Sequence, residues 1–437
     1  MQYFFSILHF SKSIFTLLFL MCLITLPFSA CTPINAEVQN DTKNKNAIVK
    51  TGIEVLRDND FKQLKGKKVG LITNATGVDS QLKSTVDILH EAGEVNLVAL
   101  YGPEHGVRGD HDAGEKVAQY TDEITGIPVY SLYGKTRKPT PEMLADIDVL
   151  VYDIQDIGSR SYTFISSMGM AMEAAAENDK EFIVLDRPNP IGGLRIEGNI
   201  VEEGYSSFVS KYKIPYVYGL TCGELAYLLN EEGMLENGAK CKISVIEMQG
   251  WKRNMSFEDT GLEWVPTSPH IPHKHSPFYY PATGIIGELY SLSIGVGYTL
   301  PFQTFAAEWI EPNAMAKEMN AFGLEGVTFR PVSFKPYYSS MKGITLHGVQ
   351  IHITDFEKAP LSTLQFYFLE AHYKLHPDKD LFALCDESRL SMFDKVCGTS
   401  KIREELMKGK SFKNIAWYWQ KDVDTFKALS KAYQLYP

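Results

Sequence analysis

Short apolar runs that alternate with amphipathic segments are the feature that most constrains the fold of this chain. Runs such as KKVGLIT (67–73), VNLVAL (95–100) and DVLVY (148–152) have the length and composition of buried strands. The segment 82–92 between two of them carries apolar residues at helical spacing. Such alternation is typical of βαβ units. We therefore expect an α/β domain with a doubly wound, mainly parallel sheet.

Four of the predicted strands are followed by polar loops marked by glycine, proline or asparagine. These loops cover residues 74–77, 102–114, 153–160 and 186–189. The carboxyl ends of parallel strands lie on one edge of a sheet, so the loops are expected to converge on one crevice. No strand is followed by the GxGxxG pattern of dinucleotide-binding domains, and there is no P-loop. The sequence therefore predicts a ligand site at this edge and no cofactor.

The segment 101–117, YGPEHGVRGDHDAGEKV, concentrates the features of a chemical site. It holds four glycines, which let the backbone approach a ligand closely, and acids that stand beside histidines. Glu104 lies between Pro103 and His105, which leaves it few conformations. We expect this loop to form the floor of an active site, with Glu104 and His105 as catalytic residues. The alternative is a polar surface loop.

The carboxylates of these loops suit hydrolysis of a glycosidic bond. That reaction needs an acid to protonate the leaving oxygen, and usually a second carboxylate as base or nucleophile. We expect Glu104 to pair with Asp153 or Asp156, although either aspartate is also suited to capping the next helix. Asp186 is expected at the same edge, as a substrate ligand or as an ion-pair partner of Arg187.

Three arginines, Arg108, Arg160 and Arg187, each lie in one of these loops. A guanidinium binds a carboxylate through two parallel hydrogen bonds, so three of them at one crevice would suit an acidic group on the substrate. A single arginine is more often a structural tie within a loop. Both interpretations remain open at the level of sequence.

The segment 264–281, WVPTSPHIPHKHSPFYYP, holds five prolines and three histidines in 18 residues. So many prolines predict an irregular wall of the site and no regular structure. Its histidines, with His105 and His111, are alternatively candidate metal ligands. The side chains outside the acidic and basic loops that we expect to contact substrate are Tyr162, His270, His273, Tyr279 and Tyr298.

The start of the chain reads as an export signal. Residues 14–28 form an apolar stretch of about 15 residues, shorter than a membrane span usually needs. The small residues before Cys31 resemble the lipobox of bacterial lipoproteins, in which that cysteine becomes lipidated. The alternative is an ordinary signal peptide. We therefore expect an exported protein, anchored to a membrane through Cys31 and lying in the periplasm or cell envelope.

Composition excludes some other classes. The net charge of -10 argues against a nucleic-acid partner. Four cysteines outside the signal do not make a disulfide framework, although pairing of Cys385 with Cys397 stays open. A change in character near residues 250–266 predicts a smaller α+β domain after the first. The expected organisation is a signal peptide at 1–30, a tether at 31–50, and domains at 51–260 and 261–437.

Seven blocks of sequence resemble, in order, those of the exo-β-N-acetylmuramidases, glycoside hydrolase family 171, formerly domain of unknown function 1343. They are GLITNATGVD (70–79), 101–117 as quoted, VYDIQDIGSRSYTFI (151–165), LDRPNPIGG (185–193), GLTCGELA (219–226), 264–288 and SIGVGYTLPFQTFAAEWI (293–310). The resemblance spans residue 51 to the C-terminus. Blocks of this length in this order are highly specific.

The resemblance implies a Rossmann-like N-terminal domain, a smaller C-terminal domain and an active cleft between them. It implies release of N-acetylmuramic acid from the non-reducing end of peptidoglycan fragments, with Glu104 as the candidate catalytic acid. The lactyl carboxylate of muramic acid would account for the arginines. Two other classes remain: a surface lipoprotein that binds glycan without cleaving it, and a metal-dependent hydrolase that uses the histidines.

Overall fold

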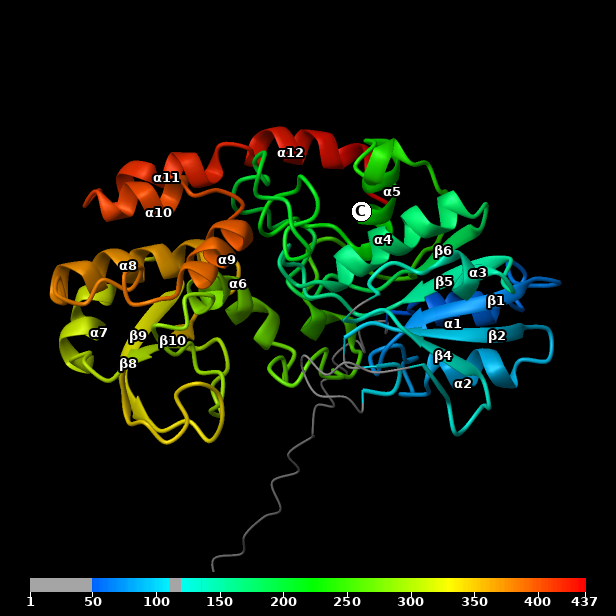
Figure 1. The fold of residues 1–437 in the computed structure, drawn as a ribbon, viewed down its shortest axis with the longest axis horizontal. Coiled ribbons are helices and arrows are strands. Elements are labelled where there is room, and N and C mark those ends of the chain that lie inside the picture. Colours follow the sequence, from blue (N-terminus) through cyan, green and yellow to red (C-terminus); the bar gives the residue numbers. More distant parts are fainter. Residues whose placement is uncertain (1–48, 105, 110–118, 135) are drawn as a thin grey trace, which may run out of the picture. The chain divides into compact units, whose positions relative to one another are not determined.

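The computed structural model describes residues 49–104, 106–109, 119–134 and 136–437 (Figure 1). Its first sheet has seven strands in the order β3-β4-β2-β1-β5-β6-β7, and all neighbours are parallel except β3 and β4. The strands are β1 (Lys68–Thr73), β2 (Asn96–Gly102), β3 (Tyr120–Thr121), β4 (Pro128–Ser131), β5 (Val149–Asp153), β6 (Glu181–Leu185) and β7 (Lys242–Ile246). The predicted α/β fold is confirmed.

Helices cover both faces of this sheet. They are α1 (Gly52–Asp58), α2 (Thr85–Glu91), α3 (Pro141–Leu144), α4 (Phe164–Glu177) and α5 (Cys222–Glu231). Leu150 and Tyr152 of β5 pack with α4 and α5, whereas Val149 and Val151 pack with α1 and α2. Successive strand residues point to opposite faces, so both faces of β5 are buried. This double burial explains why the strand sequences are continuous apolar runs.

The loops at the carboxyl ends of the strands lie against one another, as the sequence predicts. Thr73 Oγ1 donates to the Asp153 carbonyl at 2.8 Å, and Gln155 Nε2 donates to the Pro188 carbonyl at 2.7 Å. On the other side of the sheet, Leu132 N donates to the Gly102 carbonyl at 2.8 Å. The loop after β4 therefore runs beside the loop after β2, which carries Glu104.

The C-terminal part contains a three-stranded antiparallel sheet in the order β8-β10-β9. Its strands are β8 (Thr304–Ala307), β9 (Val327–Phe334) and β10 (Leu346–Ile353), and its helices are α6 (Ser276–Gly287), α7 (Pro312–Ala321), α8 (Leu364–Leu375), α9 (Glu387–Cys397), α10 (Lys401–Met407), α11 (Phe412–Gln420) and α12 (Val423–Ser430). One apolar core joins Phe305 and Phe368 of this part to Ile157 and Tyr216 of the first. The described residues belong to one compact unit, and a boundary near residue 260 stays a prediction.

Helix α6 contradicts the prediction that residues 264–281 are irregular throughout. Pro277 lies in its first turn, where no N–H is needed, but Pro281 lies inside the helix. Buried Gln365 of α8 compensates. Its Nε2 donates to the Pro281 carbonyl at 2.9 Å, while its Oε1 accepts from Ile285 N and Ile286 N at 2.9 and 3.1 Å. A side chain distant in sequence thus satisfies the backbone around the proline.

Candidate active site

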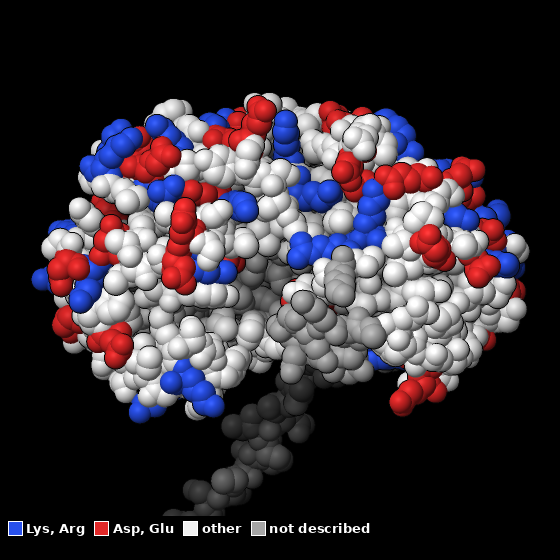
Figure 2. All heavy atoms as spheres, viewed as in Figure 1, with Lys and Arg blue, Asp and Glu red and all other residues white. Residues whose placement is uncertain are grey.

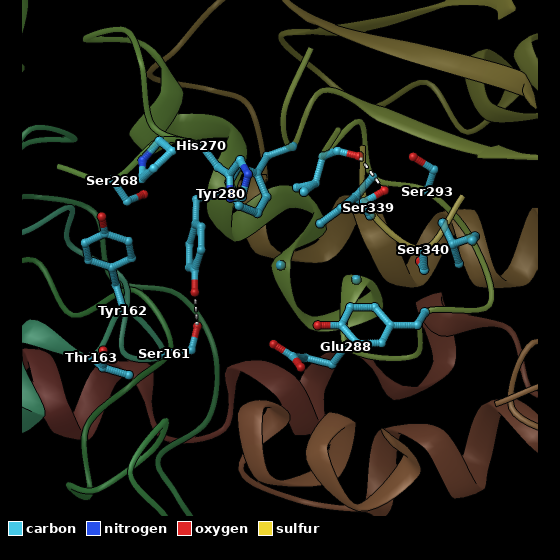
Figure 3. A pocket seen from close by; sticks show the side chains of 18 of the residues that line it. Ser161, Tyr162, Thr163, Ser268, His270, Tyr280, Glu288, Ser293, Ser339 and Ser340 are labelled. Atoms are coloured by element: carbon cyan, nitrogen blue, oxygen red, sulfur yellow. Dashed lines mark hydrogen bonds between the residues drawn. The ribbon is translucent and has the colours of Figure 1, made fainter. Parts of the chain in front are cut away.

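A cavity of about 380 Å³ is lined by the loops after β2 and β5, by α6 and by residues near 293 and 340 (Figure 3). Its polar lining consists mainly of uncharged hydroxyl groups. They include Ser161, Tyr162, Thr163, Ser268, Tyr280 and Ser293. Hydroxyls both donate and accept hydrogen bonds, so such a wall matches the hydroxyl groups of a sugar.

Glu104 lines this cavity and is half-buried. It follows the end of β2 by two residues, at the edge where the sequence predicts the site. The pKa of Tyr133 is raised to about 12, first by burial and then by the charge of Glu104 and a hydrogen bond between the two side chains. Tyr133 follows β4 and reaches Glu104 from the neighbouring loop. The second predicted catalytic residue, His105, lies outside the described residues.

Tyr162 and His270 also line the cavity, on the side where Figure 3 shows Ser268 and Thr163. The Tyr162 hydroxyl donates to Thr267 Oγ1 at 2.7 Å, and its ring meets the edge of the Tyr280 ring at 5.5 Å between centroids. Burial raises the pKa of Tyr162, and the charge of Glu104 adds to that shift. His270 Nε2 lies 2.9 Å from the Tyr338 hydroxyl.

Three other aromatic or histidine candidates do not line this cavity. Tyr279 is half-buried against the C-terminal core, and Tyr298 stacks on Phe334 at 4.8 Å between ring centroids. His273 is half-buried, and its backbone N–H contacts Ser276 Oγ at 3.2 Å. Tyr279 and Tyr298 therefore pack against the C-terminal core and the antiparallel sheet, and His273 is held through its backbone.

The structure does not place Asp153 beside Glu104 as a second cavity carboxylate. Asp153 is fully buried, and Arg187 donates to its two oxygens at 2.5 and 3.0 Å. Thr85 Oγ1 donates to the same carboxylate at 2.5 Å. The side chains of Arg187 and Thr85 thus bind the Asp153 carboxylate inside the protein.

Asp156 and Asp186 are buried, and burial raises the pKa of each to about 6. Asp156 accepts hydrogen bonds from the Tyr218 hydroxyl and, at 2.7 Å, from Gly158 N. Asp186 accepts from Thr221 Oγ1 and the Tyr436 hydroxyl at 2.7 and 2.6 Å. Asp186 therefore fastens the chain end to the sheet, and neither aspartate lines the cavity.

The expectation that three arginines meet at one crevice is wrong. Arg108 donates to Asp87 and Asp122 at 3.0 Å, and this contact lowers the pKa of Asp122 to about 2. Arg187 pairs with Asp153. Arg160 is fully buried and donates to the carbonyls of Asn199, Ile214, Val396 and Cys397 at 2.7 to 3.1 Å. The Arg160 guanidinium thus donates to backbone carbonyls of segments that are distant in sequence, and it holds these segments together.

Sequence analysis missed a second carboxylate of the cavity, Glu288, which follows α6 (Figure 3). Arg389 of α9 donates to both the side chain and the carbonyl of Glu288 and stacks over the Tyr290 ring at 3.8 Å. Burial raises the pKa of Glu288, and Arg389 opposes that shift. Glu288 directly follows a helix and not a strand. The search for polar residues at the carboxyl ends of strands therefore could not identify it.

A second cavity of about 230 Å³ adjoins the first and shares Ser268 and Pro269 with it. It is lined on the sheet side by Asn74, Ala75 and Gly109. Asn74 is only 4% exposed, and its Oδ1 accepts from both the amide and the hydroxyl of Thr76, at 3.0 and 2.6 Å. Among the described residues, nothing accepts a hydrogen bond from its Nδ2.

In the described part of the chain, no three His, Cys, Asp or Glu side chains lie close enough together to bind a metal ion. His275 Nε2 instead lies 2.8 Å from Glu258. Cys222, Cys241, Cys385 and Cys397 are free thiols. Within the same residues, every helix is too short or too polar to cross a membrane. Cys31 and His111 lie outside them.

Comparisons with known proteins agree with one another. The family models described as exo-beta-N-acetylmuramidase NamZ, N-terminal and C-terminal, match residues 69–275 and 278–436. Peptidoglycan beta-N-acetylmuramidase NamZ of Bacillus subtilis (strain 168) is 46% identical over 404 residues, which cover 92% of this chain and 95% of that protein. Two crystal structures of DUF1343 family proteins from Bacteroides fragilis NCTC 9343 are 61% and 30% identical, with TM-scores of 0.86 and 0.72. Each match covers 89% of this chain and 99% of the other.

Proposed function

This chain belongs to the NamZ family of exo-β-N-acetylmuramidases, and from that premise we propose how its cavity works. The protein is a glycoside hydrolase that acts on peptidoglycan and releases terminal N-acetylmuramic acid. We propose that the terminal sugar occupies the cavity of about 380 Å³ and that Glu104 is the acid that protonates the leaving oxygen.

The observation that carries this proposal is the position of Glu104, a half-buried carboxyl group in a cavity lined mainly by neutral hydroxyls. Hydroxyl groups orient a sugar without adding charge near the acid. Tyr133, in the neighbouring loop, lies close enough to Glu104 for the charge of Glu104 to raise its pKa. General acid catalysis of this kind contributes about 10²- to 10⁴-fold to the rate.

We propose that the scissile bond lies where the two cavities adjoin. Ser268 and Pro269 line both cavities, which supports a glycan that extends from the larger one into the smaller one. We propose that the leaving sugar lies in the smaller cavity. There the unused Nδ2 donor of Asn74 is available for a hydroxyl or acetamido oxygen.

The experiment is to incubate the protein with two matched oligosaccharides, one ending in N-acetylmuramic acid and one ending in N-acetylglucosamine. We expect free N-acetylmuramic acid from the first only, and about 10²- to 10⁴-fold slower release by E104Q. Binding of the oligosaccharide without any product would favour the glycan-binding alternative. Loss of activity in a chelator, restored by metal, would favour the metal-dependent one.

We also propose that Cys31 is lipidated and that the protein is anchored in the cell envelope. The small residues before Cys31 and the apolar stretch 14–28 support this proposal. A peptidoglycan substrate fits it, since peptidoglycan lies outside the cytoplasm. Val49 is buried and Lys50 pairs with Gln249, so the expected tether would end at residue 48 and not at residue 50.

A further inference from the structure

Muramic acid differs from glucosamine by a lactyl ether that ends in a carboxylate, and an arginine near the reacting bond would bind that carboxylate through two parallel hydrogen bonds. Arg108, Arg160 and Arg187 are engaged with protein acceptors and do not meet at the cavity. Arg389 is paired with Glu288. Lys and Arg side chains nevertheless gather near the centre of the face shown in Figure 2. A basic residue that recognises the lactyl group must lie near Glu104 and have donors that no protein carboxylate uses.

Arg137 belongs to the loop after β4, next to the loop that carries Glu104. β4 and β2 pair in parallel, with Tyr101 opposite Tyr130 and Gly102 opposite Ser131. The hydrogen bond from Leu132 N to the Gly102 carbonyl, 2.8 Å long, continues this pairing beyond the strands. The two loops thus leave the same edge of the sheet side by side.

The side chain of Arg137 is held in place without an ion-pair partner. Its guanidinium lies over the Phe208 ring, 4.1 Å from the ring centroid. Among the described residues, no carboxylate lies within ion-pair distance of it. A guanidinium stacked on a ring keeps its N–H edge available for a planar carboxylate, while the stacking reduces the entropy lost on binding. The adjacent Lys138, in contrast, pairs with Glu177 at 2.6 Å.

The charge of Arg137 also reaches the acid's immediate neighbour. Tyr133 is hydrogen-bonded to Glu104, and Arg137 acts on the pKa of Tyr133 in the direction opposite to Glu104. Arg137 is therefore close enough to influence the group that touches Glu104. If the reacting bond of a sugar lies at Glu104, a carboxylate on that sugar would also lie close enough to be attracted by the positive charge of Arg137.

We propose that Arg137 binds the lactyl carboxylate of the terminal muramic acid and so selects this sugar over N-acetylglucosamine. The inference rests on the proposed function, because it takes Glu104 as the position of the reacting bond. Arg137 acts here as a specificity residue and takes no part in the transfer of the proton.

The test compares kcat/KM for an aryl β-N-acetylmuraminide and the matching aryl β-N-acetylglucosaminide. In R137A we expect the muraminide preference to fall about 10- to 150-fold, the effect of one lost charge-assisted contact. R137K should retain part of the preference, because an ammonium keeps the charge but not the planar pair of donors. K138A is the matched control, and we expect it to keep the wild-type preference.

A second substrate separates charge recognition from damage to the fold. Methyl esterification of the lactyl group removes the anion, so the ester should be a poorer substrate than the free acid for the wild type and equally good for R137A. A preference that R137A leaves intact, or an equal loss on both sugars, would overturn the role of Arg137. A wild type that shows no muraminide preference would instead overturn the proposed function.

Discussion

Arg187 donates two hydrogen bonds to the fully buried carboxylate of Asp153, from Nε to Oδ1 and from Nη2 to Oδ2. The pair joins the loop after β6 to the end of β5, and Arg187 Nη2 also donates to the Val78 carbonyl at 2.7 Å. Asp153 and Arg187, which have the residue types of a catalytic site, thus connect the loops after β1, β5 and β6. Their contribution is to the stability of the edge on which Glu104 lies.

Replacement of Arg187 by alanine should therefore destabilise the protein and leave sugar preference unchanged. Removing one member of a buried ion pair costs about 3–5 kcal/mol, because the other charge stays buried without a partner. Urea unfolding measures this loss. The control is K240A, because Lys240 and its partner Glu231 are 55% and 50% exposed, and we expect it to cost less than about 1 kcal/mol. A small loss of stability together with an altered preference for the muraminide would instead indicate that Arg187 binds the substrate.

Asp156 should make the protein less stable as the pH rises. Burial raises its pKa from 3.8 to about 6, so the folded state binds more protons than the unfolded state between these values. Its contribution to stability is fully present below pH 3.8 and is lost as the pH rises through about 6. D156N keeps an acceptor for Tyr218 and Gly158 but cannot ionise.

The measurement for Asp156 is the free energy of unfolding of wild type and D156N at pH 4 and pH 7. The decline between these pH values should be smaller in D156N by up to about 3 kcal/mol, since one pKa unit corresponds to about 1.4 kcal/mol. Asp186 also has a pKa raised to about 6, so part of the decline should remain in the variant. Identical declines in both proteins would mean that Asp156 does not titrate in this range.

Asn74 should contribute to binding of the leaving sugar and not to that of the terminal one. N74D keeps the Oδ1 acceptor that Thr76 uses and replaces the free Nδ2 donor with an acceptor. We expect kcat/KM for a muramic acid–glucosamine disaccharide to fall about 3- to 10-fold, the effect of one lost hydrogen bond. The rate with an aryl muraminide, which has no second sugar, serves as the control. An equal fall on both substrates would place Asn74 in the larger cavity or in the fold.

Lipidation of Cys31 predicts a specific labelling pattern in cells. A fatty-acid probe should label the wild type and C22S, because Cys22 lies within the apolar signal stretch, but should not label C31S. Labelled protein should also stay with the membranes after cell breakage, whereas C31S should be released. Equal labelling of C31S and wild type would exclude this cysteine as the anchor.

The sequence predicted the parallel sheet well because the burial of these strands is visible in their composition. All five residues of β5 are buried, so its apolar run VLVY (149–152) indicates a strand without knowledge of its neighbours. The capping box of α5 depends on equally local sequence: Thr221 Oγ1 accepts from Glu224 N, and Glu224 Oε2 accepts from Thr221 N. The short strand β8 was missed because four residues carry too little pattern.

The roles of individual polar side chains were harder to predict because distant partners decide them. Arg160 lies in a predicted site loop, yet two of its acceptors are the carbonyls of Val396 and Cys397, more than 230 residues away. Pro281 argued against a helix, but Gln365 satisfies the backbone around it. Arg137 was missed because it follows β4, whose loop was not among the four loops considered.

The central claim is that Glu104 delivers a proton to the leaving oxygen, and its most direct test is a series of aryl N-acetylmuraminides whose leaving phenols differ in acidity. The account predicts that E104Q loses about 10²- to 10⁴-fold in kcat with weakly acidic phenols and much less with strongly acidic ones, which depart without a proton. The wild type should depend only weakly on phenol acidity. A loss of the same size across the whole series would contradict Glu104 as the general acid.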